Sequence, residues 1–249
     1  MSSEQRSVAI IPARLESSRL PRKALAEICG MPMIVHVYKR CLLAETLDDV
    51  YVATDSTEIK HNVERHGGKV IMTSPDHQTG TDRLAEAAKY LNAEIVVNVQ
   101  GDEALVNPQY IDKVVNTMWN APDINVGILV NPYSKRNSAS DIKVVLNDHN
   151  DVMYFSRADI PSNARVENAP MLKAYHIVPF RKEFLLQYAQ WDKGALEQIE
   201  FNEYLRILER GYRIRAVHVE SDAISVDTAS DLEYVREKMP DDRWFLQYK

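Results

Sequence analysis

The chain has 249 residues, of which 45% are hydrophobic and 27% are charged, and its formal net charge at pH 7 is −6. This composition is typical of an ordinary globular protein that buries one sizeable core, and it excludes a disordered chain. The acidic balance provides no general attraction to nucleic acid or to an anionic membrane, so neither partner is expected. Any phosphate site must therefore be a local cluster of cations.

The N-terminal region predicts an α/β fold. β-Branched and apolar runs predict four strands, at residues 7–12, 49–54, 69–72 and 94–99. Apolar residues at helical spacing predict helices between them, over residues 32–45, 56–66 and 81–91, with Ser56 capping the second. Such alternation indicates a mostly parallel sheet with helices on both faces, a Rossmann-like three-layer arrangement.

The rest of the chain mixes strands and helices less regularly. We predict strands at residues 142–146, 152–155, 171–180 and 212–219, and helices at 182–190, 196–209 and 228–239. No Pro-, Gly- or Ser-rich linker separates the two halves. We therefore expect a single α/β domain over residues 1–249, with a smaller mixed lobe added by the second half.

Cysteine usage and the N-terminus suggest a cytoplasmic protein. Cys29 and Cys41 have no metal-ligand spacing, and we expect both to be reduced thiols packed as small hydrophobic side chains. The first residues lack an apolar run long enough for a signal peptide, and no later run approaches a membrane span.

A basic loop follows the first predicted strand. It carries four cations, Arg14, Arg19, Arg22 and Lys23, with short serines between them. Several guanidinium and ammonium donors at the carboxyl end of a strand suit a polyphosphate, because ligands of such sheets bind at those ends. The alternative is a solvated basic loop, and cation density alone leaves both interpretations open.

Two aspartates are candidate metal ligands. Asp102 follows the strand at 94–99 after Gly101, where a carboxylate is well placed to bind Mg²⁺. Asp227 precedes the last predicted helix, and its functional interpretation is a second metal ligand opposite Asp102. The alternatives are a turn aspartate at Asp102 and a helix cap at Asp227 or Thr228.

The polar loop at residues 72–83 leads into the helix predicted from Thr81. Unpaired N–H groups at that helix start, with Arg83 in the first turn, suit a nucleobase edge or a phosphate. The alternative is a plain capping loop in which Arg83 pairs with Asp82 or Glu86.

Together, these motifs in this order resemble the 3-deoxy-manno-octulosonate (KDO) cytidylyltransferases, also called CMP-KDO synthetases. The resemblance runs from about Val8 to Met239. The matching segments are IIPARLESSRLPRK, GMPMIVHVYKR, VYVATD, GGKVIMTSPDHQTGTDRLAEA, VNVQGDEALV, IKVVLN, MYFSRADIP and SVDTASDLEYVR. Eight segments in register make the resemblance specific.

The resemblance implies a nucleotide-diphospho-sugar transferase fold, a homodimer, Mg²⁺ as cofactor and a role in lipopolysaccharide biosynthesis. It implies attack by the anomeric hydroxyl of an acidic sugar on the α-phosphorus of CTP, with release of pyrophosphate. Residues 1–130 would bind CTP, and residues 131–249 would bind the acid and form the dimer.

The resemblance also assigns residues. The catalytic group would be Arg14, Arg19, Lys23, Asp102 and Asp227, with the three cations on the triphosphate and both aspartates on Mg²⁺. The other CTP-binding residues would be Ala13, Ser18, Thr79, Gly80, Arg83 and Gln100. The acid pocket would contain Arg157, His176, Glu203 and Tyr204.

The departures from the family cluster in the acid pocket. Ala174 stands where the family has His, Val178 where it has Tyr, and Tyr204 where it has Gln. A site that loses hydrogen-bonding groups must prefer a different ligand, and His176 and Arg22 are additional cationic or hydrogen-bond-donating groups near the expected acid. The acceptor is therefore KDO, or 8-amino-KDO, another ulosonic acid or a phosphonate. A catalytically silent CTP-binding regulator is the alternative, against which the retained aspartates argue.

Overall fold

The computed structural model describes residues 6–16, 20–221 and 224–249. The chain divides into two compact units, which we call unit 1 (Met1–Asp112 with Asp222–Lys249) and unit 2 (Lys113–Ser221). The sequence suggested one domain with halves meeting at residue 130. In the structure the C-terminal segment instead returns to the N-terminal unit, and this return carries Asp227 into unit 1.

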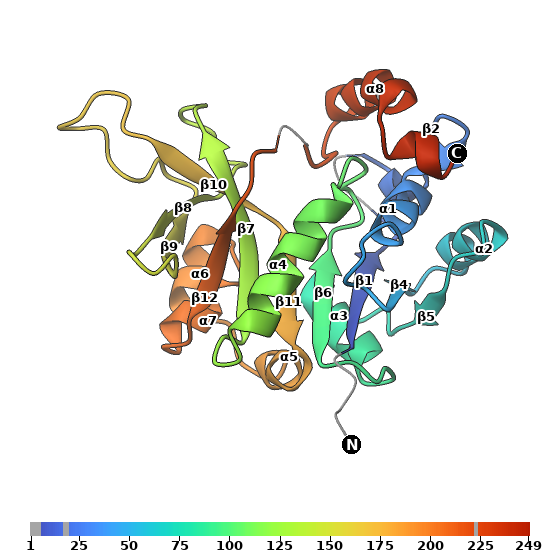
Figure 1. Ribbon diagram of the computed structural model, residues 1–249, viewed down its shortest axis with the longest axis horizontal. Coiled ribbons are helices and arrows are strands. Elements are labelled where there is room, and N and C mark those ends of the chain that lie inside the picture. The colour runs from blue at the N-terminus through green and yellow to red at the C-terminus, as the bar shows by residue number, and fades with distance from the viewer. Residues whose placement is uncertain (1–5, 17–19, 222–223) are drawn as a thin grey trace. The chain divides into compact units, whose positions relative to one another are not determined.

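Unit 1 contains the four strands predicted first. They are β1 (Ser7–Ala13), β4 (Asp49–Thr54), β5 (Val70–Met72) and β6 (Ile95–Val99), and they are parallel in the order β5-β4-β1-β6 (Figure 1). Every residue of β1 is buried, as expected for a strand covered on both faces. The predicted parallel arrangement is confirmed here.

Helices connect these strands as predicted. They are α1 (Met33–Cys41), α2 (Thr57–Arg65) and α3 (Gly80–Ala88). The Ser56 side chain accepts a hydrogen bond from the backbone N–H of Ile59 and caps α2. Thr79 caps α3, so this helix begins one residue before the predicted start. The loop between β1 and α1 contains a short 3-10 helix, η1 (Lys23–Leu25), and a hairpin of β2 (Glu27–Ile28) and β3 (Met31–Pro32).

The two cysteines differ, which corrects one expectation. Cys41 is buried in α1, but Cys29 is exposed. Cys29 lies in the turn of the β2–β3 hairpin with a φ of 46°, followed by Gly30 with a φ of 82°. Both residues are left-handed, which a two-residue hairpin turn requires, and this geometry keeps Cys29 out of the core.

The C-terminal segment of unit 1 is anchored through a buried arginine. It comprises α8 (Ala229–Lys238), η2 (Met239–Asp241) and η3 (Phe245–Gln247). The Arg40 side chain is fully buried and donates to Asp242 at 2.6 Å and to the carbonyl of Val106 at 3.2 Å. Val226, Leu232, Val235, Met239 and Phe245 pack in one core cluster with Ile28, Met33 and Ala104. These contacts fix the segment that carries Asp227.

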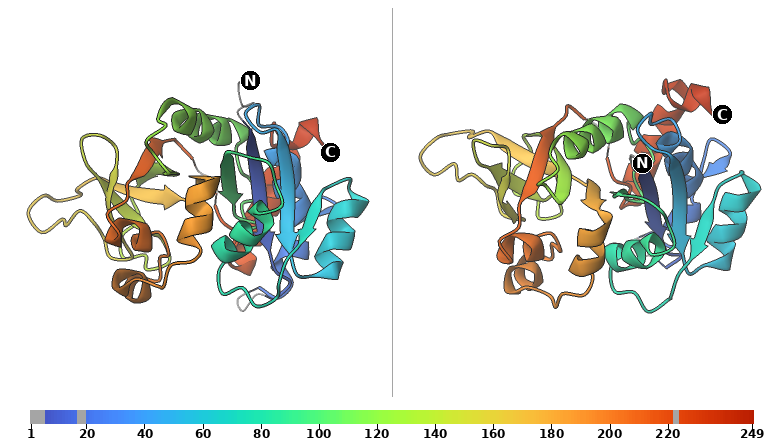
Figure 2. Two further views of the ribbon diagram at one scale, coloured as in Figure 1. Left: turned by 90° about the horizontal axis from the view of Figure 1, so that it is seen from below. Right: turned by 60° about the horizontal axis from the view of Figure 1, so that its bottom comes forward.

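Unit 2 is built around β7 (Val126–Tyr133), which pairs in parallel with β12 (Ile214–His218) and antiparallel with β10 (Met171–Tyr175) and β11 (Ile177–Arg181). β8 (Lys143–Leu146) pairs with β10, and β9 (Val152–Ser156) pairs with β8 (Figure 2). The sequence patterns did not identify β7 or α4 (Pro108–Asn120), which begins in unit 1 and ends in unit 2.

Two predicted elements of unit 2 are divided in the structure. The strand predicted at 171–180 is β10 and β11, separated by His176. The helix predicted at 196–209 is α6 (Ala195–Glu200) and α7 (Leu205–Glu209), because Phe201 is left-handed with a φ of 49° and ends α6. The remaining helix, α5 (Lys182–Tyr188), follows β11 as predicted.

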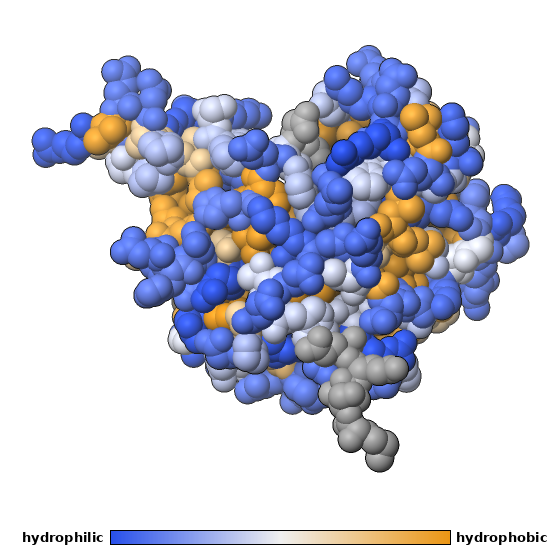
Figure 3. All heavy atoms as spheres, in the orientation of Figure 1, coloured by the Kyte–Doolittle hydropathy of each residue, from blue (hydrophilic) through white to orange (hydrophobic). Residues whose placement is uncertain are grey.

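The face of the molecule in Figure 3 is largely hydrophilic, with apolar patches between the polar groups. Among the described residues, no helix combines the length and the apolar character needed to cross a bilayer.

Candidate active site

Three residues that are distant in sequence meet in unit 1. The Lys23 ammonium lies 2.7 Å from Oδ2 of Asp102 and 3.2 Å from Oδ1 of Asp227. All three side chains are partly exposed. The two aspartates that the sequence singled out are therefore joined by one cation from the basic loop.

Local structure explains how each member reaches this cluster. Arg22, with a φ of 57°, turns the chain into η1, which carries Lys23. Asp102 lies in the turn after β6, where a Cβ at Gly101 would come within 3.1 Å of the carbonyl oxygen of Pro12. Glycine allows this close approach, which places Asp102 beside the end of β1.

The cap of α8 lies at Thr228. The Thr228 side chain accepts from the backbone N–H of Asp231, and Asp231 reaches back in a capping box. The backbone N–H of Val226 donates to the carbonyl of Asp102 at 3.0 Å. The segment before α8 is thereby held next to Asp102, and the Asp227 carboxylate contacts Lys23.

The charges of the cluster stabilise one another. Burial alone would lower the pKa of Lys23, but the Asp102 and Asp227 carboxylates outweigh it and raise the pKa above its ordinary value. Lys23 is therefore a firmly protonated ammonium at neutral pH.

The donor set fits a magnesium ion. Two carboxylates that meet at one cation supply the hard oxygen ligands that Mg²⁺ prefers. No group of three or more His, Cys, Asp or Glu side chains suited to a metal occurs among the described residues. An ion bound here would complete its coordination with water and phosphate oxygens, as Mg²⁺ commonly does.

The other loop cations are placed differently. Arg14 follows β1 and is exposed. Arg22 forms an ion pair with Glu58 of α2 within unit 1, so the structure does not support its expected place beside the acid. Ser18 and Arg19 lie outside the described residues. Among the described cations of this loop, Lys23 alone contacts both aspartates.

Four of the other residues assigned to CTP lie around the ends of β1 and β6. Ala13 is the buried last residue of β1, and Gln100 directly follows β6. A Cβ at Gly80 would lie 3.4 Å from Cγ of Pro12 and 3.9 Å from Oε1 of Gln100. The start of α3, with Thr79 and Gly80, therefore packs against these two strand ends.

Arg83 has partners that the sequence did not suggest. Its guanidinium donates to Oγ1 of Thr73 at 2.6 Å and pairs with Asp55 at 3.0 Å. The alternative partners Asp82 and Glu86 are wrong, because they have other roles. Asp82 completes the capping box of α3, and Glu86 accepts from His77 and from the backbone N–H of Ser74. Arg83 is buried, and its role in binding cytosine stays a prediction.

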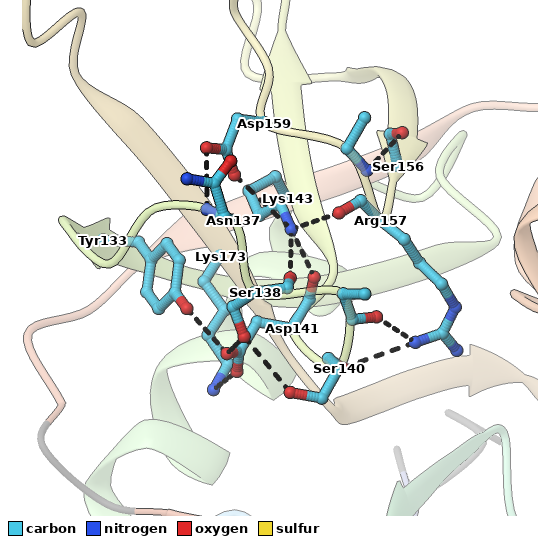
Figure 4. Close-up of polar contacts among 12 residues, drawn as sticks. Tyr133, Asn137, Ser138, Ser140, Asp141, Lys143, Ser156, Arg157, Asp159 and Lys173 are labelled. Carbon is cyan, nitrogen blue, oxygen red and sulfur yellow. Dashed lines mark hydrogen bonds and ion pairs between the residues drawn. The ribbon is translucent and has the colours of Figure 1, made fainter.

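In unit 2, the Arg157 guanidinium donates hydrogen bonds to main-chain carbonyl groups. Its guanidinium donates to the carbonyl oxygens of Glu200 at 2.7 Å, Ala139 at 2.7 Å and Phe201 at 3.1 Å. The fully buried Lys143 donates to the carbonyls of Ser138 and Arg157 in the same region (Figure 4). Arg157 thus joins three segments of unit 2, and its predicted contact with the acid is untested.

His176 and Tyr204 belong to an aromatic cluster. The Tyr204 ring centroid lies 6.0 Å from His176, 6.3 Å from Phe180 and 6.5 Å from Phe155. Burial, followed by Lys173 and Arg157, lowers the pKa of His176 to about 4. His176 is therefore neutral at pH 7, which corrects its interpretation as an added cation.

The remaining acid-pocket positions are also inside the protein. Glu203 is partly buried, and its carbonyl accepts from the Tyr188 hydroxyl at 2.9 Å. Ala174 and Val178 are fully buried. Val178 and Phe180 are two residues apart on β11 and share a face. The larger Tyr204 thus occurs together with smaller residues at Ala174 and Val178, as a repacked core requires.

Some residues near the site were missed by sequence analysis. The pairing of Asp55 with Arg83 was not predicted, although Asp55 directly follows the strand predicted at 49–54. Glu103 is buried and accepts from the hydroxyl of Ser225, joining the turn after β6 to the segment before α8. The signal was present, since both acids follow predicted strands, but their partners lie 28 and 122 positions away.

The fold and the lysine–aspartate cluster define an α/β enzyme of the nucleotide-diphospho-sugar transferase type. The chain belongs to the cytidylyltransferase family, whose model matches residues 8–214. It is a nucleotidyltransferase that uses CTP.

Individual relatives agree with this assignment. The chain is 42% identical to the 3-deoxy-manno-octulosonate cytidylyltransferase of Geobacter sulfurreducens, over 93% of this chain and 98% of the relative. It is 40% identical to the enzyme of the same name from Escherichia coli, over 94% and 96%. A solved CMP:2-keto-3-deoxy-manno-octonic acid synthetase in complex with CTP superposes with a TM-score of 0.92 at 39% identity, over 95% of this chain and 99% of that one.

A more distant neighbour shares the fold alone. The 4-diphosphocytidyl-2C-methyl-D-erythritol synthase of Anaerococcus prevotii superposes with a TM-score of 0.65 at 15% identity, over 95% of this chain and 96% of that one.

Proposed function

We propose that this enzyme transfers CMP from CTP to KDO or a close relative of KDO and releases pyrophosphate. The observation that carries the proposal is the contact of Lys23 with Asp102 and Asp227. A triphosphate needs cations, a metal on that triphosphate needs carboxylates, and this cluster holds both kinds of group together.

The reaction is a direct displacement. The anomeric hydroxyl oxygen of the sugar attacks the α-phosphorus of CTP, the bond from that phosphorus to the α–β bridging oxygen breaks, and pyrophosphate carries away the electron pair. The hydroxyl proton leaves to solvent. Such transfers depend on positioning and charge neutralisation, so no covalent nucleophile is needed.

Each part of the site has a proposed role. Lys23, Arg14 and Arg19 neutralise the triphosphate, with Ser18 in the same loop. Asp102 and Asp227 would hold Mg²⁺, which when bound neutralises phosphate charge and lowers the pKa of a coordinated hydroxyl. Ala13, Thr79, Gly80 and Gln100 border the nucleoside, and the buried Arg83 supports it while paired with the partly exposed Asp55.

The acceptor is the open part of the proposal. The identity of the relatives supports KDO, whereas Ala174, Val178 and Tyr204 support a changed pocket for 8-amino-KDO, another ulosonic acid or a phosphonate. His176, Glu203, Tyr204 and Arg157 are the proposed acid-side residues. The family resemblance further supports a homodimer, a cytoplasmic location and a place in lipopolysaccharide synthesis.

The test is pyrophosphate release from CTP and Mg²⁺ with a panel of these acids. We expect release with at least one of them, and the acid that gives the fastest release identifies the acceptor. Binding of CTP without release for any acid would reject the transferase and favour a silent CTP-binding regulator.

A matched variant tests the changed pocket. Ala174→His with Val178→Tyr and Tyr204→Gln restores the family's residues, and Tyr204→Gln offsets part of the volume that the other two substitutions add. We expect its activity on KDO, relative to the other acids, to rise. An unchanged acid profile in this folded variant would contradict the proposed acid-side role of these positions.

A further inference from the structure

Lys23 contacts one oxygen atom of each carboxylate that would hold a metal. Its ammonium nitrogen lies 2.7 Å from Oδ2 of Asp102 and 3.2 Å from Oδ1 of Asp227. The three side chains are 18%, 22% and 33% exposed, respectively, so small ions can reach them from solvent.

A divalent cation and the Lys23 ammonium would compete for the carboxylates of Asp102 and Asp227. Mg²⁺ binds carboxylate oxygens at about 2.0–2.1 Å. An ammonium bound to those oxygens would lie within a few ångströms of the ion, and the two positive charges repel each other strongly at that separation. Lys23 also lowers the local charge of the two carboxylates from −2 to −1, which weakens their attraction for a cation.

We propose that Lys23 and the divalent cation exchange at these two carboxylates. When the cation binds Asp102 and Asp227, the ammonium is released and turns, on its flexible four-carbon chain, to the phosphates of CTP. This inference rests on the proposed function, because it takes the same aspartates as metal ligands and the same lysine as a phosphate ligand.

The exchange makes Lys23 the residue that couples the two ligands. The metal alone binds weakly, because it must displace the lysine from its two partners. CTP alone binds weakly, because the lysine stays on the carboxylates. Binding of either the metal or CTP moves Lys23 away from the carboxylates, so the other ligand then binds without that free-energy cost. The two ligands therefore bind cooperatively, and the coupling is reciprocal.

The alternative to the exchange is that Lys23 stays on the carboxylates when the metal binds. Lys23 contacts one oxygen of each carboxylate, so a cation that bound through the other oxygens would leave it where it is. Lys23 would then bridge the carboxylates permanently, and it would stay protected from reagents whenever the metal is bound.

The first experiment measures Mn²⁺ binding to the nucleotide-free protein by electron paramagnetic resonance. Mn²⁺ is the probe, and the proteins are the wild type, Lys23→Met and Lys69→Met. We expect Lys23→Met to bind Mn²⁺ about tenfold more tightly than the wild type, because the competing charge is gone. Lys69→Met removes a lysine that pairs with Asp49, outside the proposed site, and should bind like the wild type. Equal or weaker binding by Lys23→Met overturns the proposal.

The second experiment follows Lys23 itself in the wild-type protein. An amine-acylating reagent labels the lysines, and mass spectrometry gives the labelling rate of Lys23 relative to Lys69. Lys69 is the control because it is also held by a carboxylate, Asp49, at 2.7 Å. Filling the site with Mn²⁺ should raise the relative rate of Lys23 several-fold, and adding CTP should lower it again.

The outcomes separate the exchange from the proposed function. Slow labelling of Lys23 while Mn²⁺ is bound overturns the exchange, even where pyrophosphate release is normal. Binding of Mn²⁺ by Lys23→Met but not by nucleotide-free wild type supports it, since the lysine then excludes the ion completely. Absence of pyrophosphate release with every acid rejects the proposed function separately, because the binding and labelling measurements do not depend on turnover.

Discussion

Each of the two units contains a lysine surrounded by oxygen atoms, and the two surroundings differ in kind. Lys23 in unit 1 contacts the carboxylates of Asp102 and Asp227 and is partly exposed. The fully buried Lys143 in unit 2 donates to three main-chain carbonyls, at 2.6 Å to Ser138, 2.9 Å to Asp141 and 2.5 Å to Arg157. The carboxylate of Asp159 is more distant, at 3.8 Å.

The difference appears in the pKa of each lysine. The pKa of Lys23 is raised, because two carboxylates outweigh the effect of burial. The pKa of Lys143 is lowered, chiefly by burial. A lysine that donates to main-chain carbonyls joins segments of the chain. A lysine that contacts partly exposed carboxylates lies where a ligand can compete for those carboxylates. The groups around a buried or half-buried lysine therefore distinguish a structural role from a role in binding or catalysis.

The largest expected effect is on the carboxylates of unit 1. Asp102→Asn and Asp227→Asn should each lower kcat about 10³-fold or more, since each removes a carboxylate that we propose would hold the metal on the phosphates. Pyrophosphate release measures this effect, and urea unfolding should show stability close to that of the wild type. Asp49→Asn, at the opposite end of β4 from Asp55, is the control and should retain turnover. Wild-type rates in both site variants would contradict a catalytic role for the carboxylates of unit 1.

The next effect separates the two lysines. Lys143→Met leaves buried carbonyls without a donor and should lower the free energy of unfolding by about 2–4 kcal/mol. Lys23→Met should change it by no more than about 1 kcal/mol, because its ion pairs are partly exposed. Urea titrations of both variants give the two values, and kcat should fall for Lys23→Met. Similar stability losses in the two variants would contradict the distinction.

Acid should weaken both units through one histidine in each. Burial lowers the pKa of His36 in unit 1 and of His176 in unit 2 to about 4 each, compared with about 6.5 in an unfolded chain. Both are neutral when folded, so the stability present above pH 6.5 is lost as the pH falls toward 4.

The expected loss is up to about 1.4 kcal/mol per pH unit for each histidine. Urea unfolding at pH 7 and pH 5 measures it. Replacing His176 by Phe, which preserves the aromatic packing, should reduce the loss. Equal stability of the wild type at both pH values would contradict the neutral state of these rings.

The smallest effect concerns the loop before α3. Glu86 holds this loop through His77 and the backbone N–H of Ser74. Glu86→Gln should raise the KM for CTP about threefold with little change in kcat, because looser contacts weaken positioning of the nucleoside more than the chemistry. Glu64→Gln, on an exposed i,i+4 pair of α2, is the matched control. A lower kcat with an unchanged KM would contradict a positioning role.

Much of unit 1 could be predicted from the sequence. Strand β4 has the predicted limits, and Ser56 caps α2 as expected, because both features depend on residues close together in the chain. The same holds for Asp102 after a glycine at a strand end. Where neighbours in the sequence do not determine the backbone, prediction was poorer. The left-handed residues Cys29 and Phe201 exposed a thiol and divided a helix.

The sequence by itself determined most of the strands and helices in residues 7–99, the family, and the two aspartates and the lysine that are candidates for the chemistry. Only the tertiary structure decided which charges meet. Lys23 is separated from Asp102 by 79 positions and from Asp227 by 204. Their contact depends on the parallel order of the strands and on the return of the C-terminal segment, anchored by Arg40 and Asp242. Local propensity does not encode such distances, because they result from packing of the whole unit.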